Sequence, residues 1–264
     1  RRTMGTEGFK GKIVVITGAG QGQGRYFAEQ FYHAGAAVSL LDLNSKSLDE
    51  VVKDMGPTDS DRFKAYATDV SDSTQVSAII EDIGKHFGKI DILINNAGIL
   101  HKSMIETSTD DHIELMIRVN LMAPMYCTRS VIPFMKREGG NIINVSSILA
   151  TFPNTSSGAY GAAKNGLVTL TRVWAAELAP YDIRVNCYAP GVVNTPMMSE
   201  IFVQHREESK LSQIPLRRFG ESEDIFKLLS FLCSEQAEYI TGQTIGIDGG
   251  MWATQTPTIA WNKK

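Results

Sequence analysis

The sequence contains few cysteines and no long hydrophobic segment. Only three cysteines occur in 264 residues, Cys127, Cys187 and Cys233, and they lie far apart in apolar surroundings. This number and spacing favour neither a disulfide framework nor a zinc site, and the five histidines show no metal-ligand spacing. No apolar run approaches the roughly 18 residues that a transmembrane helix requires. We therefore expect buried thiols in a reducing, cytoplasmic compartment, with no metal and no membrane partner.

Excess charge of either sign is also missing. The chain has 26 Lys and Arg against 29 Asp and Glu, a net charge of -3, so no electrostatic feature favours nucleic acid or an anionic membrane surface. No repeat, low-complexity tract or Pro/Ser-rich linker divides the sequence. With 43% hydrophobic residues the chain can bury a full core, so we predict one domain over residues 1–264, with a flexible N-terminus at 1–8.

Short β-rich apolar runs alternate with longer segments of helical periodicity. This alternation predicts right-handed βαβ crossovers, and hence a doubly wound, Rossmann-like α/β fold with a mostly parallel seven-stranded sheet flanked by helices. The predicted strands are Lys12–Thr17, Ala37–Leu41, Phe63–Thr68, Ile90–Ile94, Asn141–Val145, Ile183–Cys187 and Thr244–Ile247. The predicted helices are Gly24–His33, Lys46–Lys53, Thr74–His86, Asp110–Lys136, Gly158–Leu178 and Glu223–Leu232. The irregular stretch 194–215 follows the sixth strand, and it is either a substrate loop or an ordinary surface loop.

A glycine cluster lies between the first predicted strand and the first predicted helix. Gly18, Gly22 and Gly24 are spaced so that exposed backbone N–H groups and the helix dipole can hold a diphosphate. Asp42 ends the next strand, at the distance expected of an acid that binds the adenine ribose hydroxyls. That carboxylate repels a 2′-phosphate, and neither Gln21 nor Leu43 is basic, so NAD is preferred over NADP. A plain turn without a ligand is the alternative for both features.

Tyr160 and Lys164 are one helical turn apart and therefore share a helix face. The preceding strand ends at Ser146 and Ser147, which brings hydroxyl groups to the same edge of the sheet. A phenol has a reference pKa near 10, and a neighbouring ammonium group stabilises its phenolate form. We therefore expect Lys164 to lower the pKa of Tyr160, which then acts as a general acid and base at one alcohol carbon.

With these motifs in order, the sequence resembles the short-chain dehydrogenase/reductase family over essentially its whole length. The resemblance implies a catalytic tetrad of Asn120, Ser147, Tyr160 and Lys164, with Ser147 and Tyr160 binding substrate. It also implies that Lys164 binds the nicotinamide ribose and that Asn120 holds a water in a proton relay. The implied cofactor residues are Gly18, Gln21, Gly22, Gln23, Gly24, Asp42, Leu43, Asp69, Val70, Asn96, Ala97, Gly98, Tyr160, Lys164, Pro190, Gly191, Val193 and Thr195.

One position departs from the family pattern. Gln23 stands between the last two glycines, where Ile or Leu is common, and we expect little effect because this residue contributes mainly its backbone N–H. Asn120 has a second interpretation, as a structural amide that bridges a helix kink. Relatives commonly form homotetramers through the two long helices here predicted at 110–136 and 158–178, and we expect the same.

The expected activity is hydride transfer between NAD(H) and a secondary alcohol or ketone, with a polyol, diol, cyclic alcohol or hydroxysteroid as substrate. One alternative is reduction of a 3-oxoacyl thioester, and another is an inactive NAD-binding sensor or scaffold. Candidate apolar substrate contacts do not decide the polarity of the pocket, because each is also a normal core residue. They are Ile148, Leu149, Phe152, Tyr188, Val192, Met197 and Met198.

Overall fold

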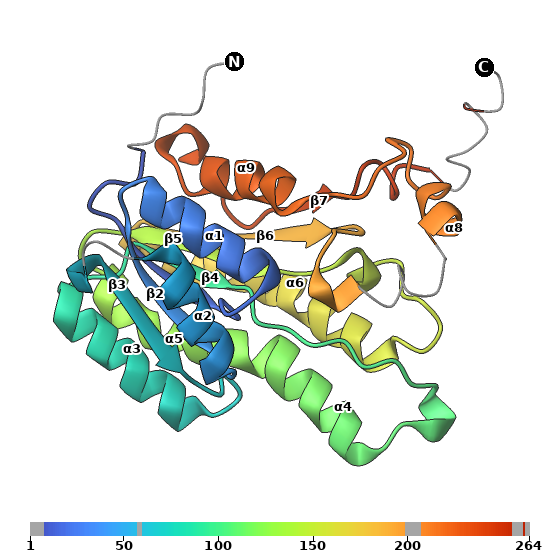
Figure 1. The fold of residues 1–264 in the computed structure, drawn as a ribbon, viewed down its shortest axis with the longest axis horizontal. Helices are drawn as coiled ribbons and strands as arrows, with labels where there is room; N and C mark the ends of the chain where they lie inside the picture. The colour runs from blue at the N-terminus through green and yellow to red at the C-terminus, as the bar shows by residue number, and fades with distance from the viewer. Residues whose placement is uncertain (1–7, 57–59, 199–206, 255–260, 262–264) are drawn as a thin grey trace.

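The computed structural model describes residues 8–56, 60–198, 207–254 and 261, and it contains one seven-stranded parallel sheet (Figure 1). The strand order is β3-β2-β1-β4-β5-β6-β7, and every pairing between these strands is parallel. The strands are β1 Ile13–Thr17, β2 Ala37–Asp42, β3 Phe63–Ala67, β4 Ile92–Asn95, β5 Gly140–Val145, β6 Ile183–Pro190 and β7 Thr244–Ile247. The predicted doubly wound fold is therefore confirmed.

Helices cover both faces of this sheet, as an all-parallel sheet requires. The described α-helices are α1 Gly22–His33, α2 Ser45–Met55, α3 Ser73–Phe87, α4 Asp110–Ile117, α5 Ala123–Met135, α6 Gly158–Leu178, α8 Glu207–Leu211 and α9 Ser222–Leu232. One core forms where α1, α2 and α9 pack on the sheet, around residues such as Phe27 and Leu229. The second core forms where α3, α5 and α6 pack on the opposite face, around residues such as Ile80 and Val131.

Strand order reverses between β1 and β4, which are neighbours at the centre of the sheet. In doubly wound sheets, ligands bind outside the carboxyl ends of the strands at such a switch point. The glycine cluster follows β1 and residues 96–98 follow β4, so both predicted cofactor segments lie at this point. The segments that follow β5 and β6 continue the same edge.

The predicted helix over Asp110–Lys136 forms without interruption, but it is not α-helical throughout. A π-helical turn, Arg118–Met122, separates α4 from α5 and carries Asn120. Such a turn inserts an extra residue into the helix, and it is frequent at functional sites.

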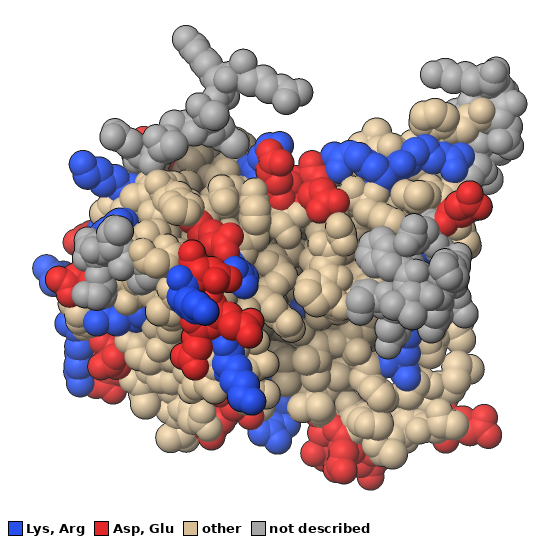
Figure 2. All heavy atoms as spheres, viewed as in Figure 1, with Lys and Arg blue, Asp and Glu red and all other residues tan. Residues whose placement is uncertain are grey.

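The predicted substrate loop at 194–215 is partly outside the described residues, as are residues 1–7 of the expected flexible N-terminus. Its described parts include a 3-10 turn, Pro196–Met198, and the short helix α8. None of the described helices is both long and apolar enough to span a bilayer. On the face shown in Figure 2, positive and negative side chains lie next to one another in groups, and uncharged surface separates these groups.

Candidate active site

The loop after β1 has a backbone that only glycine adopts easily. Gly18 and Gly22 have φ of 65° and 56°, in the left-handed region. A Cβ at Gly18 would lie 2.8 Å from the Cα of Ala97, so the loop packs directly on the segment after β4. Thr17 and Asn96 join the two segments: Thr17 Oγ1 accepts from Asn96 N at 3.0 Å, and Asn96 Nδ2 donates to Thr17 O at 2.9 Å.

The N-terminus of α1 lacks a capping side chain. Its N-cap residue, Gln21, is exposed and makes no side-chain cap hydrogen bond, whereas α2 and α3 are capped by Asn44 and Asp72. The first-turn N–H groups of α1 therefore face the loop without a side-chain acceptor. Uncapped donors beside a glycine cradle fit a dinucleotide diphosphate, which would accept from these groups.

Asp42 supports this loop directly. Its Oδ2 accepts from Gly20 N at 2.8 Å, and its Oδ1 accepts from Asn44 N at 2.9 Å. A Cβ at Gly20 would lie 3.0 Å from Asp42 Cγ, which explains the glycine there. The carboxylate thus braces the glycine loop, a role that the sequence prediction did not include, and its remaining lone pairs stay available to ribose hydroxyls. Leu43 beside it is 73% exposed, and the predicted adenine-side residues Asp69 and Val70 lie just after β3, before α3.

The segment after β6 closes the other side of the site. Gly191 packs so tightly on Asp248 that a Cβ would lie 2.8 Å from the Cα of that residue, and Gly191 N donates to Ile247 O at 3.0 Å. A Cβ at Gly22 would lie 4.0 Å from Thr195 Cβ, so the loops after β1 and β6 meet. The structure therefore brings Pro190, Gly191, Val193 and Thr195 to the same end of the sheet as the glycine cradle.

Ser147, Tyr160 and Lys164 are all buried where β5 leads into α6. Ser147 Oγ accepts from Leu149 N at 3.1 Å, so its O–H is the donor in its hydrogen bond with the Tyr160 side chain. Lys164 Nζ donates to Val145 O at 2.8 Å and lies 5.8 Å from the centre of the Tyr160 ring. Ser146 Oγ donates to Lys164 O at 2.9 Å, and this bond links the end of β5 to α6.

Burial governs the ionisation of the central pair. It raises the pKa of Tyr160, while a hydrogen bond with the Ser147 side chain opposes this shift. The net shift of the Tyr160 pKa is therefore upward, whereas we expected a lowered pKa. Burial also lowers the pKa of Lys164 to about 8. Tyr160 is therefore a protonated phenol at neutral pH, ready to donate a proton.

Asn120 lies on the π-helical turn with its amide fully engaged. Its Nδ2 donates to the carbonyl oxygens of Ile99 and Met116, both at 3.0 Å, and its Oδ1 accepts from Ile99 N at 3.2 Å. The prediction of an amide that bridges a helix irregularity is confirmed. Gly98 lies between this amide and Lys164: a Cβ there would be 3.0 Å from Asn120 Oδ1 and 3.3 Å from Lys164 Nζ. Asn120 and Lys164 therefore lie on either side of Gly98, Lys164 lies beside the Tyr160 ring, and Tyr160 is hydrogen-bonded to Ser147.

The Gln23 side chain has a partner that sequence reasoning missed. Tyr188 Oη donates to Gln23 Oε1 at 3.2 Å, and this corrects the expectation that Gln23 contributes little beyond its backbone. The sequence signal that could have revealed the pair is a polar Gln where Ile or Leu is common, together with a Tyr hydroxyl that needs a partner inside the fold.

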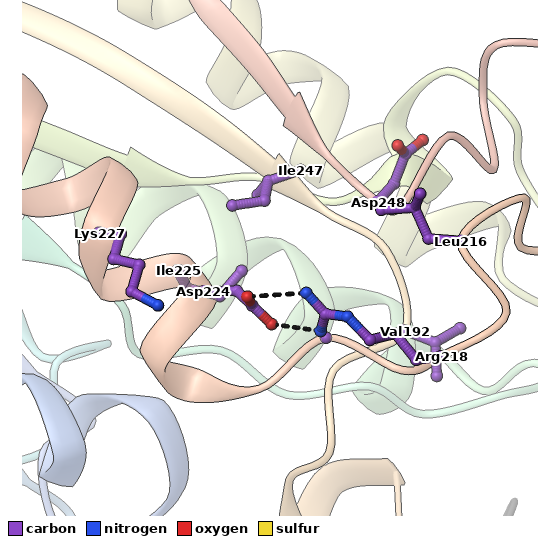
Figure 3. Close-up of a pocket in the computed structure, with 10 residues that line it drawn as sticks. Val192, Leu216, Arg218, Asp224, Ile225, Lys227, Ile247 and Asp248 are labelled. Carbon is purple, nitrogen blue, oxygen red and sulfur yellow. Dashed lines mark hydrogen bonds and ion pairs between the residues drawn. The ribbon is translucent and has the colours of Figure 1, made fainter. Parts of the chain in front are cut away.

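A pocket of about 180 Å³ lies away from these catalytic groups, between the ends of β6 and β7 and the start of α9 (Figure 3). Three of its four charged side chains form ion pairs: Arg218 contacts both oxygens of Asp224, at 2.6 and 2.9 Å, and Lys227 pairs with Glu223 at 2.8 Å. The fourth, Asp248, accepts hydrogen bonds from the backbone N–H groups of Gly250 and Trp252. Arg218 lowers the pKa of Asp224 to about 2. None of the predicted catalytic residues Asn120, Ser147, Tyr160 and Lys164 lines this pocket.

The fold and the cluster at the switch point define a dinucleotide-dependent oxidoreductase. Comparison with known proteins agrees: the family model described as enoyl-(acyl carrier protein) reductase matches residues 18–252. The chain belongs to the short-chain dehydrogenase/reductase family.

Its relatives carry several activities. The chain is 37% identical to the 3-oxoacyl-[acyl-carrier-protein] reductase FabG of Thermotoga maritima, over 92% of this chain and 98% of that one. A crystal structure titled short-chain dehydrogenase/reductase, glucose/ribitol dehydrogenase, from Brucella melitensis superposes with a TM-score of 0.87 at 32% identity, over 92% and 98% of the two chains. A 3-ketoacyl-(acyl-carrier-protein) reductase from the same organism, complexed with NADH, superposes with a TM-score of 0.85 at 33% identity, over the same shares.

Proposed function

We propose that the chain is an NADH-dependent reductase of 3-oxoacyl thioesters. The observation that carries the proposal is the convergence of a donor-oriented Ser147 with a protonated, buried Tyr160, in a chain 37% identical to FabG across almost its full length. This choice revises the expected substrate from a polyol or cyclic alcohol to the thioester alternative.

Exposed apolar side chains on the loops that follow the strands support an apolar substrate. The loops after β4, β5 and β6 carry Met104, Ile105, Phe152 and Met197, which are 51%, 85%, 56% and 49% exposed. Of the other candidate contacts, Ile148, Tyr188 and Val192 are buried. Exposed apolar residues clustered on neighbouring loops are typical of ligand sites, and an acyl chain covers them better than a polyol does.

Asp42 supports NADH over NADPH. Its carboxylate lies at the end of β2 beside the glycine loop, held by Gly20 and Asn44, and the next residue is the exposed Leu43 rather than a basic one. A 2′-phosphate at this place would meet a fixed negative charge. The related reductase from Brucella melitensis, solved with NADH, shows that a protein of that activity can bind this cofactor.

The chain's own residues carry the proton in the proposed reduction. When bound, a reduced nicotinamide supplies the hydride to the carbonyl carbon. Ser147 donates a hydrogen bond to the carbonyl oxygen, and Tyr160 donates the proton that this oxygen needs as its negative charge develops. The Lys164 ammonium beside the Tyr160 ring then stabilises the phenolate that remains. In the oxidative direction, Tyr160 accepts the proton.

The test is NADH consumption at 340 nm with four substrate classes: a 3-oxoacyl coenzyme A, a trans-2-enoyl coenzyme A, a ketose and a cyclic ketone. The proposal expects the 3-oxoacyl thioester to have the highest kcat/KM. Preference for the ketose or the cyclic ketone would return the assignment to the alcohol dehydrogenase type, and preference for the enoyl thioester would point to reduction of a carbon–carbon double bond. The same assay with NADPH in place of NADH tests whether Asp42 selects the cofactor that lacks a 2′-phosphate.

A further inference from the structure

Gln23 and Tyr188 form a partly buried polar contact between the glycine cluster and β6. Tyr188 is fully buried, with 0% of its surface exposed, and its hydroxyl donates to Gln23 Oε1 at 3.2 Å across 165 positions of sequence. A buried phenol without a partner costs roughly 1–3 kcal/mol. Gln23 therefore accepts the hydrogen bond that the buried Tyr188 hydroxyl needs.

The backbone of Tyr188 connects this contact to both halves of the site. Tyr188 O accepts from Ser146 N at 2.9 Å, next to the catalytic Ser147, and in the β5–β6 register Tyr188 lies opposite Val145. Since side chains alternate along a strand, Tyr188 and Pro190 point to the same face of β6. Gln23, in turn, lies in the first turn of α1, inside the glycine cluster.

The hydrogen bond also fixes the orientation of the Gln23 amide. Because Oε1 accepts from Tyr188, the donor Nε2 is directed elsewhere. In the part of the chain that the structure describes, no group accepts a hydrogen bond from Gln23 Nε2. Gln23 is the second residue of α1, and the terminus of this helix has no capping side chain. An amide donor added to the backbone N–H donors of this terminus suits an anionic acceptor.

We propose that Gln23, oriented by Tyr188, is a cofactor-binding side chain that donates from Nε2 to the diphosphate of the bound dinucleotide. Leu or Ile at this position supplies only its backbone N–H, so the pair gives this chain an additional polar contact with its cofactor. The inference rests on the proposed nucleotide dependence but not on the identity of the carbonyl substrate.

A double-mutant cycle separates packing from cofactor binding. Gln23→Leu leaves the Tyr188 hydroxyl buried without a partner, so its melting temperature should fall by about 2–6 °C. Tyr188→Phe removes that hydroxyl, so the double variant Q23L/Y188F should melt higher than Q23L alone. The affinity for NADH should behave differently from the melting temperature, because both variants that carry Q23L lack the Nε2 donor. We expect each to bind NADH about tenfold more weakly, while Tyr188→Phe, which keeps the donor but loses its orientation, has a smaller effect.

Ligand fragments locate the contact. Q23L should weaken ADP-ribose, which contains the diphosphate, about tenfold in calorimetry, and should leave AMP nearly unaffected. Gln30→Leu makes the same substitution further along α1, where no side-chain hydrogen bond is made among the described residues, and Tyr32→Phe removes a buried hydroxyl that has no partner there. Both serve as matched controls.

Three results would overturn the proposal: unchanged NADH affinity in Q23L, recovery of affinity in the double variant together with stability, or loss of NADH affinity with ADP-ribose binding intact. The last of these would move the contact away from the diphosphate. Binding and melting are measured without a carbonyl substrate. A wild-type protein that binds NADH but reduces no thioester therefore refutes the proposed substrate and leaves the role of Gln23 to be decided by these data.

Discussion

Gly98→Ala tests the claim that Asn120 and Lys164 act as one cluster. The added Cβ would lie 3.0 Å from Asn120 Oδ1 and 3.3 Å from Lys164 Nζ, both shorter than an ordinary carbon–polar contact. Asn120 is held on both sides by Ile99 and by Met116, and Lys164 is held by Val145, so neither group can withdraw freely. One of them must move by a few tenths of an ångström.

That displacement sets the expected size of the effect. A misplacement of 1 Å costs about 100-fold in rate, so a shift of roughly half that size should lower kcat about tenfold. The backbone of Gly98 is outside the left-handed region and accepts alanine without strain. NADH affinity and melting temperature should therefore change much less than kcat.

The matched control is Gly158→Ala, two residues before Tyr160, because a Cβ there meets nothing within 4 Å. The assay is steady-state NADH oxidation with a 3-oxoacyl thioester, accompanied by NADH titration and thermal melting. If G98A kept the kcat of the wild type while folding normally, the tight arrangement of Asn120 and Lys164 around Gly98 would not matter for turnover, and the reasoning would be refuted.

Three further predictions concern ionisation, cofactor choice and assembly. Burial lowers the pKa of Lys164 to about 8, from its ordinary 10.5, so between these pH values the unfolded chain binds more protons than the folded one and the free energy of unfolding increases as the pH rises. Lys164→Met should lose this increase. Equal pH slopes for the variant and the wild type, measured in urea unfolding from pH 8 to 10.5, would contradict the prediction. Asp42→Ala should narrow the preference for NADH over NADPH and also weaken both cofactors through loss of the Gly20 brace, so an unchanged kcat/KM ratio would remove Asp42 from the ribose role. We also propose a homotetramer, supported by the exposed Leu115, Met125 and Val173 on α4, α5 and α6, and a monomer in light scattering would exclude it.

Local patterns were enough to predict the strands and the order of the motifs. The buried run Ile13–Thr17 and the caps Asn44 and Asp72 act within a few residues, so their signals are visible in sequence. The end of β6 was harder: we predicted Cys187, whereas the strand continues to Pro190 because β7 pairs with these last residues. That pairing depends on a strand more than 50 positions away.

Contacts between distant segments account for what the sequence could not show. The π-helical turn at Arg118–Met122 accompanies the hydrogen bonds between Asn120 and Ile99. The hydrogen bond from Gly20 N to Asp42 joins the segments that follow β1 and β2. The ionisation of Tyr160 depends on burial, which composition does not reveal. Gln23 was recognised as unusual, but only its contact with Tyr188 gave it a physical role.

Tyr160→Phe tests the central claim most directly, because it removes one proton donor and little else. NADH oxidation at 340 nm with a 3-oxoacyl thioester should fall by a factor of about 10²–10⁴ relative to the wild type, while NADH titration gives nearly the same affinity. Turnover by Y160F at the wild-type rate would contradict the account, since the proton for the carbonyl oxygen would then come from another group.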